Sequence, residues 1–291
     1  MSELQVRMAA PAASVGWRDQ VPWKRYRLLI IGGMLVVLVL LSAIFAGPIS
    51  PYSPFAIDVV GKLKPPSPQH LLGTDEIGRD VLSRTIFAAR ISMEVAAVAV
   101  SIGLFGGTVV GVASAYLGDP IDTILMRLME LVFSFPAILL AVVLMAMLGT
   151  SVVNAMIAIG IIFIPGFARL ARVSAQWILR QQYIEAAHAI GMSDWRIVFR
   201  EIMPNVTTPL LVEGAVAFAY AVLLESSLSF LGLGAQPPNP SWGNMLNSGR
   251  GFMDQAPWLG IVPGSALFLA VLGFNLLGDG LRDWLDPHLK D

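Results

Sequence analysis

Long apolar blocks without charges alternate with shorter polar segments along this chain. A helix needs roughly 20 apolar residues to cross a bilayer core of about 30 Å. Apolar blocks of that length lie at 28–46, 95–118, 208–231 and 258–278. The uncharged stretch 131–168 is too long for one crossing, and the small and polar residues from Gly149 to Asn154 predict a tight turn within it. The pattern therefore predicts an all-α integral membrane protein with six transmembrane helices.

The composition agrees with a chain that is largely in contact with lipid. Only 13% of the residues are charged, whereas a soluble domain has about a quarter. The absence of cysteine excludes disulfides, iron–sulfur clusters and thiolate zinc sites. The three histidines, His70, His188 and His288, are too scattered for a metal site. The net charge of −1 gives no reason to expect nucleic acid as a partner.

The distribution of lysine and arginine predicts the orientation of the chain. With both termini in the cytoplasm, 13 of the 19 basic residues lie on the inner side, as the positive-inside rule requires. The first apolar block is longer than the core of a signal peptide and is followed by five more, so we expect it to be retained.

These features divide the chain into five parts. They are a cytoplasmic tail (1–27), a first transmembrane helix (28–47), an external loop with an amphipathic segment (48–93), a five-helix core (94–280) with a long inner loop (170–207), and a cytoplasmic C-terminus (281–291).

Charged and apolar residues alternate at helical spacing from Thr74 to Met93. The alternation predicts an amphipathic helix that lies at the outer membrane surface before the second crossing. The alternative is a loop packed on the outer face of the protein.

In the second crossing, Gly103, Gly107 and Gly111 recur at steps of four and predict a stripe for close helix packing.

The inner loop 170–207 is rich in charge and in helix-forming residues. Gly191 is expected to separate two short helices, Ser193 to cap the second by accepting a backbone hydrogen bond, and Pro204 to end it. A short helix, a turn and a second helix would form a compact projection that can dock into a groove on another protein.

The run Glu185-Ala186-Ala187, followed after three residues by Gly191 and after twelve more by Pro204, resembles the EAA loop of binding-protein-dependent ABC importer permeases. Glu201 and Met203 depart from the common pattern of that loop. Further similarity to the "C"-type permeases of the dipeptide, oligopeptide and nickel group lies in 72–84, 225–246 and 274–287.

The resemblance implies a type I ABC importer permease fold of the bacterial inner membrane, with a cytoplasmic coupling helix formed around Glu185, Ala186, Ala187, Gly191 and Pro204. It implies a second permease subunit, two ATP-binding subunits and an external binding protein as partners. ATP and Mg²⁺ would be bound by those ATPase chains, because this chain lacks a G-x-x-x-x-G-K-[ST] loop and needs no cofactor of its own. We therefore expect a transport subunit rather than an enzyme.

The resemblance favours di- and oligopeptides as the imported substrate. Nickel chelates, glutathione and other small solutes are the alternatives. A stand-alone secondary transporter would require inverted repeats and ion-coordinating residues at mid-membrane, and an intramembrane enzyme would require a nucleophile or paired aspartates there. Neither pattern occurs in the sequence.

Three residues are candidates for the substrate pathway or its gate: Glu225, Gln236 and Trp242. A carboxylate at membrane depth is costly unless it is paired or wetted. Glu225 could therefore meet a peptide amine, but hydrogen bonds to Ser226, Ser227 or Ser229 are the alternative we favour. Glu213 lies near the inner end of the same crossing. Glu185 could pair with a basic residue of the ATPase or with a local arginine such as Arg180.

Overall fold

The computed structural model describes residues 23–285, and every regular element in that range is a helix. The elements are α1 (Trp23–Ile44), α2 (Ala46–Ile49), η2 (Val59–Gly61), α3 (Val81–Leu117), α4 (Ile121–Phe133), α5 (Ala137–Leu148), α6 (Val152–Leu179), α7 (Gln182–Ala189), α8 (Asp194–Ile197), η3 (Val198–Ile202), α9 (Met203–Phe230), α10 (Trp242–Gly249), η4 (Arg250–Phe252) and α11 (Trp258–Leu285). Residues 1–22 of the predicted tail 1–27 and residues 286–291 of the predicted C-terminus 281–291 lie outside the described residues.

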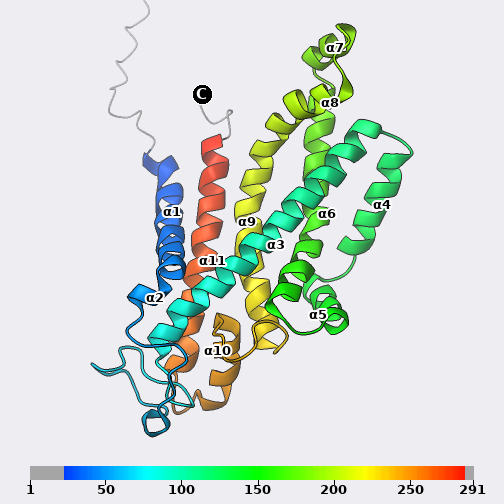
Figure 1. Cartoon of the computed structure of the whole chain (residues 1–291). Helices are drawn as coiled ribbons and strands as arrows, with labels where there is room; N and C mark the ends of the chain where they lie inside the picture. The colour runs from blue at the N-terminus through cyan, green and yellow to red at the C-terminus, as the bar shows by residue number, and fades with distance from the viewer. Residues whose placement is uncertain (1–22, 286–291) are drawn as a thin grey trace, which may run out of the picture.

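The passages of the chain through the bundle can be followed in Figure 1. Five helices are long and apolar enough to cross a membrane, and they contain α1, α3, α6, α9 and α11. The remaining passage is α4 followed by α5, which are bent by 90° at the break between them. The 12 residues of α5 extend only about 18 Å, too short for a crossing by one helix. The prediction of six membrane passages is confirmed, with the third one broken.

The break between α4 and α5 lies at Pro136. Pro136 precedes α5 with φ −56° and ψ 128°, an extended conformation that ends the helical path. The predicted turn between the third and fourth passages is confirmed, because α5 ends at Leu148 and Ser151 caps α6 by accepting a hydrogen bond from the Asn154 N–H.

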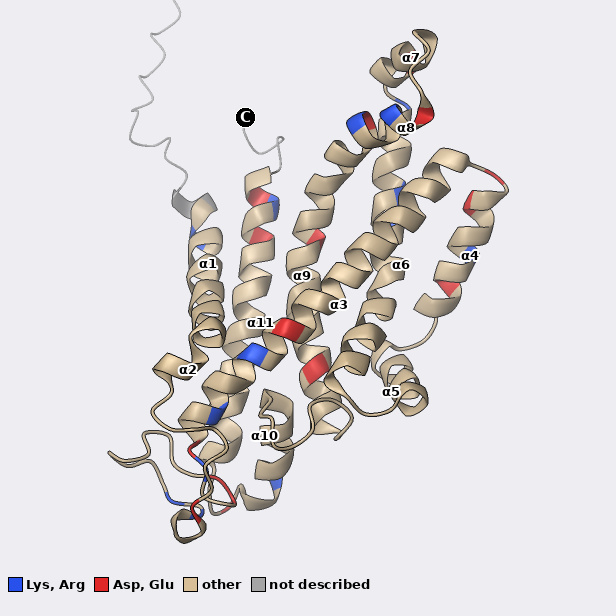
Figure 2. Cartoon of the chain, viewed as in Figure 1, with Lys and Arg blue, Asp and Glu red and all other residues tan. Residues whose placement is uncertain are grey.

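The two ends of the bundle differ in character (Figure 1). The start of α1, the end of α11 and the pair α7–α8 lie at one end, here called the α7 end. The segment between α2 and α3 lies with α10 at the opposite end, the α10 end. Charged residues gather in that segment and around α8, and few lie in the middle of the bundle (Figure 2).

The glycine stripe of α3 packs against α6. A Cβ on Gly103 would lie 2.5 Å from the Phe163 Cβ, and one on Gly111 would lie 2.7 Å from the Ala171 Cβ. Both distances are shorter than any real contact between such atoms. The predicted close approach is therefore confirmed, and it allows α3 and α6 to pack along much of their length.

The amphipathic helix predicted for 74–93 is wrong in its first third. Residues before Val81 form a turn, in which the Asp75 Oδ1 accepts hydrogen bonds from the backbone N–H groups of Ile77 and Arg79. Gly78 has φ +84°, which ends helical geometry there. Asp80 then caps α3 by accepting a hydrogen bond of 2.8 Å from the Ser83 N–H. From Val81 onward the chain is already the buried start of the long helix α3, so no separate surface helix exists.

Candidate functional site

The projection predicted from the inner loop is present at the α7 end and consists of α7, α8 and η3. We call residues 182–202 the knob. Gly191 has φ +76°, as its predicted role in a sharp turn requires. The Met192 N–H donates to the Ala187 carbonyl and the Gly191 N–H to the His188 carbonyl. This pair of bonds is a Schellman motif, which favours glycine at the left-handed position.

Two details of the knob differ from the sequence prediction. Ser193 stands at the N-cap of α8, but its side chain accepts no capping hydrogen bond. Pro204 does not end the helix, because residues Asp194–Phe230 run on as one membrane-spanning helix. Pro204 lies in the first turn of α9, directly after the π-helical turn η3. A wider turn relieves the clash between a proline ring and the preceding carbonyls, so the chain tolerates proline here.

The knob has a buried face and an exposed apolar face. Ile184, Ile197 and Ile202 are buried and belong to the hydrophobic core. The exposed face carries large apolar side chains, namely Tyr183, Ile190, Trp195 and Phe199, with exposed fractions of 45%, 78%, 72% and 50%. The Trp195 and Phe199 rings lie 3.9 Å apart at their centroids. Exposed apolar side chains of this size on a projection are typical of a protein-binding surface.

The three motif residues of α7 point in different directions. Ala187 is only 7% exposed and packs inside the knob, whereas Ala186 and Glu185 are exposed. Within residues 23–285, Glu185 forms no ion pair, so the suggested pairing with Arg180 is not formed. Tyr116 at the end of α3 donates a 2.7 Å hydrogen bond to Asp194, which ties the knob to the bundle.

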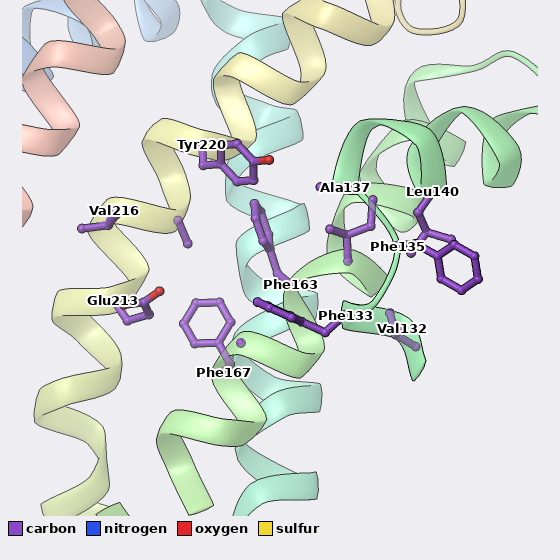
Figure 3. Close-up of a pocket in the computed structure, with 13 residues that line it drawn as sticks. Val132, Phe133, Phe135, Ala137, Leu140, Phe163, Phe167, Glu213, Val216 and Tyr220 are labelled. Carbon is purple, nitrogen blue, oxygen red and sulfur yellow. The ribbon is translucent and has the colours of Figure 1, made fainter. Parts of the chain in front are cut away.

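A cavity of about 430 Å³ lies between the α4–α5 break, α6 and α9 (Figure 3). Its wall is mostly apolar and aromatic. The lining residues are Val132, Phe133, Phe135, Ala137, Leu140, Ile162, Phe163, Gly166, Phe167, Glu213, Val216, Ala217 and Tyr220. Its volume falls within the range of small-molecule sites, and it contains one carboxylate and one phenol hydroxyl among apolar groups.

The carboxylate in this cavity belongs to Glu213, while Glu225 lies elsewhere. Glu225 is 1% exposed and accepts hydrogen bonds from Ser92 at 2.8 Å and Ser229 at 2.7 Å. These bonds, with a longer one from Ser226, match the serine alternative. Glu225 thus joins α3 to α9, and it does not line the cavity.

The two other pathway candidates lie at the α10 end. Trp242 is 2% exposed and donates its indole N–H to the Thr85 carbonyl at 3.1 Å, which anchors α10 on α3. Gln236 donates to the carbonyls of Gly232 and Gly234 at 3.0 and 3.1 Å. Gln236 lines a small cleft of about 170 Å³, separate from the larger cavity. Their role in gating stays a prediction.

Glu213 could have been found from sequence spacing. Glu213, Val216, Ala217 and Tyr220 follow the i, i+3, i+4, i+7 pattern of one helix face. That pattern alone does not reveal whether the face meets lipid or a cavity.

Across the described chain, no group of three or more histidine, aspartate or glutamate residues could hold a metal ion.

Comparison with known proteins adds three findings. Residues 107–291 match the family described as the binding-protein-dependent transport system inner membrane component. The chain is 41% identical over 275 residues to the dipeptide transport system permease protein DppC of Alkalihalophilus pseudofirmus, covering 94% of this chain and 90% of that one. It is 40% identical over 278 residues to the glutathione transport system permease protein GsiD of Pectobacterium atrosepticum, covering 94% and 92%.

A solved structure has a similar fold. It is described as the crystal structure of an amino acid ABC transporter with histidines, and one of its chains superposes with a TM-score of 0.50 at 16% identity. The match covers 68% of this chain and 92% of that chain. At this identity the likeness concerns the fold alone.

Proposed function

The chain belongs to the family of inner membrane components of binding-protein-dependent transport systems, and we propose that it forms half of a pathway for di- and oligopeptides. It is a multi-pass permease subunit of an ABC transporter, with the fold of that class. Peptides are favoured as substrate because two relatives at 40% identity or more are named for a dipeptide and for glutathione, itself a tripeptide. Nickel chelates and other small solutes remain the alternatives.

A permease of this kind works with a partner permease, an ATPase and a binding protein. We propose one homologous permease, two ATP-binding subunits and one external binding protein. ATP and Mg²⁺ would be bound by the ATP-binding subunits. This chain lacks the glycine-rich phosphate loop that would bind ATP. Its exposed apolar knob offers a surface for such a partner.

The observation that carries this coupling role is the continuity of one helix. Asp194–Phe230 forms one helical path, which passes through the π-helical turn η3, from the knob to the wall of the cavity, where it supplies Glu213 and Tyr220. A rigid helix transmits a displacement along its length. The docked knob, in which Glu185 and Ala186 are exposed and Gly191 forms the turn, would follow the ATPase subunits as they close and open. Its movement would therefore move the cavity wall.

The knob end of the bundle is proposed to be cytoplasmic. The start of α1 and the end of α11 share that end (Figure 1), which fits cytoplasmic termini and the positive-inside bias. The segment 48–80 and α10 would then face the binding protein. Trp242 and Glu225 would hold the outer part of the pathway together, and Gln236 would lie where substrate is delivered.

Purification and uptake test this proposal. The tagged chain, extracted in mild detergent, should carry a second permease and ATPase chains with phosphate-binding loops. Cells lacking the gene should lose uptake of labelled di- and oligopeptides and regain it on complementation. Unchanged peptide uptake in the deletion strain, with a nickel chelate or another solute lost instead, would reject the peptide assignment while leaving the permease family intact.

A further inference from the structure

Glu213 has no partner within the described chain. Its side chain is exposed at the edge of the cavity, and no hydrogen bond or ion pair to it occurs within residues 23–285. It lies ten residues into α9, about 15 Å along the helix axis. Every other residue that lines the cavity is uncharged. A carboxylate in a membrane-crossing helix is costly unless a cation or water meets it.

The surroundings of Glu213 are those of a site for an organic cation. Phe133, Phe163 and Phe167 stand around the space toward which the carboxyl is directed (Figure 3). The faces of aromatic rings attract ammonium groups, and a carboxylate adds a direct charge-assisted hydrogen bond. A ligand with an ammonium group and an apolar substituent can bind the carboxylate and the aromatic rings at the same time.

The distance along α9 fits a short peptide. Tyr220 lies seven residues beyond Glu213 on the same wall, about 10 Å along the axis. An extended chain spans about 3.3–3.6 Å per residue, so this length corresponds to about three residues. The Tyr220 hydroxyl can donate a hydrogen bond to a carbonyl or carboxylate at the far end.

We propose that Glu213 binds the protonated amino terminus of a di- or tripeptide within the permease, with the adjacent apolar side chain against the phenylalanine rings. The inference rests on the proposed peptide import and adds to it a specificity-determining residue. The membrane complex itself then distinguishes peptides with a free α-amino group from those without one. Glu225, already satisfied by serine hydroxyls, has no part in this recognition.

The test compares a labelled dipeptide such as Ala-Phe with its N-acetyl derivative in the reconstituted complex. Both are supplied at concentrations that saturate the purified binding protein, so that remaining discrimination arises in the membrane complex. The wild type should import the free peptide faster. Glu213→Gln should reduce the ratio of free to acetylated uptake about tenfold or more, as expected for losing a hydrogen bond between charged groups. Glu213→Asp should retain most of the preference.

A matched control is available in Glu94→Gln. Glu94 lies on α3, is 59% exposed at its side chain, pairs with Arg90 at 3.6 Å and does not line the cavity. This variant should keep the wild-type ratio. An equal ratio in Glu213→Gln and wild type would overturn the inference. So would equal loss of both substrates together with loss of the partner permease on purification, because Glu213 would then be a subunit contact. If the wild type imports neither peptide, the proposed function itself fails.

Discussion

The guanidinium of Arg169 lies over the ring of Phe133, 4.6 Å from its centroid. Phe133 ends α4 and lines the cavity, whereas Arg169 lies on α6 in a separate cleft of about 490 Å³. Arg172, in the same cleft, donates a 2.6 Å hydrogen bond to Asp122 at the start of α4. Two arginines of α6 therefore hold α4, and the contact between Arg169 and Phe133 joins a residue of the cleft to a residue of the cavity.

Removing the Arg169 cation should make the cavity more accessible from the cleft. The chain contains no cysteine, so Val216→Cys would be a unique probe in the cavity wall. In inside-out vesicles, Arg169→Leu should raise the labelling rate of this cysteine by a membrane-impermeant maleimide about threefold or more, since a cation–π contact contributes about 0.5–1 kcal/mol or more. Arg169→Lys, which retains a cation, is the control. Equal labelling in all three backgrounds would show that the ring is not held in place by Arg169.

Gly191→Val should uncouple the transporter without removing it from the membrane. The left-handed φ of +76° costs a β-branched residue roughly 1–2 kcal/mol or more. No atom lies within 4 Å of the position of a Cβ there, so the effect is conformational rather than steric. We expect normal amounts of membrane protein, weaker ATPase co-purification and loss of transport.

The control for this variant is Gly33→Val. Gly33 lies in α1, also with nothing within 4 Å of a Cβ, and it has helical φ. It should transport normally. Full transport in Gly191→Val would argue against a coupling role for the knob.

The two alanines of α7 should respond differently to a bulky residue. Ala186→Phe adds a ring on the exposed face and should block docking of the ATPase while the knob stays folded. Ala187→Phe overpacks the knob interior, which should cost about 1–3 kcal/mol and expose 182–202 to protease. Co-purification and limited proteolysis of the two variants separate these outcomes. Identical protease patterns with identical docking would contradict the assignment of the two faces.

Gly107→Ala should destabilise the bundle more than Gly106→Ala. A Cβ on Gly107 would lie 2.7 Å from the Ala168 backbone nitrogen, which cannot move without shifting α6. A Cβ on Gly106 would meet only the Ile164 side chain, at 3.2 Å, and a side chain can adjust. We expect a cost of about 1–3 kcal/mol for the first variant and little for the second. Thermal aggregation of the purified complex measures the difference, and equal midpoints would contradict the close α3–α6 packing.

The sequence alone predicts the helices well because membrane crossing imposes a length and excludes charge. The turn at Gly191 was equally predictable, since a glycine between two amphipathic segments has few other uses. The size of the bend at Pro136 was not predictable, because a proline within an apolar run can either kink a helix or end it. The turn before Val81 was missed because the charged residues that shape it also occur at helical spacing.

Sequence spacing places Glu213 and Glu225 on a helix face each, but it does not show which of the two carboxylates lines the cavity, for a geometric reason. Glu213 and Glu225 lie on one helix and are twelve residues apart, so at about 100° per residue their side chains point roughly 120° apart. Sequence does not reveal how that helix is rotated about its axis. The structure turns Glu225 toward Ser92 of α3 and Glu213 toward the cavity. The coupling role of the knob and the gating role of the outer loop stay predictions that the experiments above address.

The continuous helix Asp194–Phe230 has the proportions of a lever. Its 37 residues extend about 55 Å, and Glu213 lies about 25 Å from the Phe230 end. If the helix pivots at its Phe230 end, a tilt of about 5° moves the knob by about 5 Å and Glu213 by about 2 Å. A displacement of the knob is thus about twofold smaller at the cavity, and the force there is larger by the same ratio. A large movement of the ATPase would become a smaller and stronger one at the proposed substrate cavity.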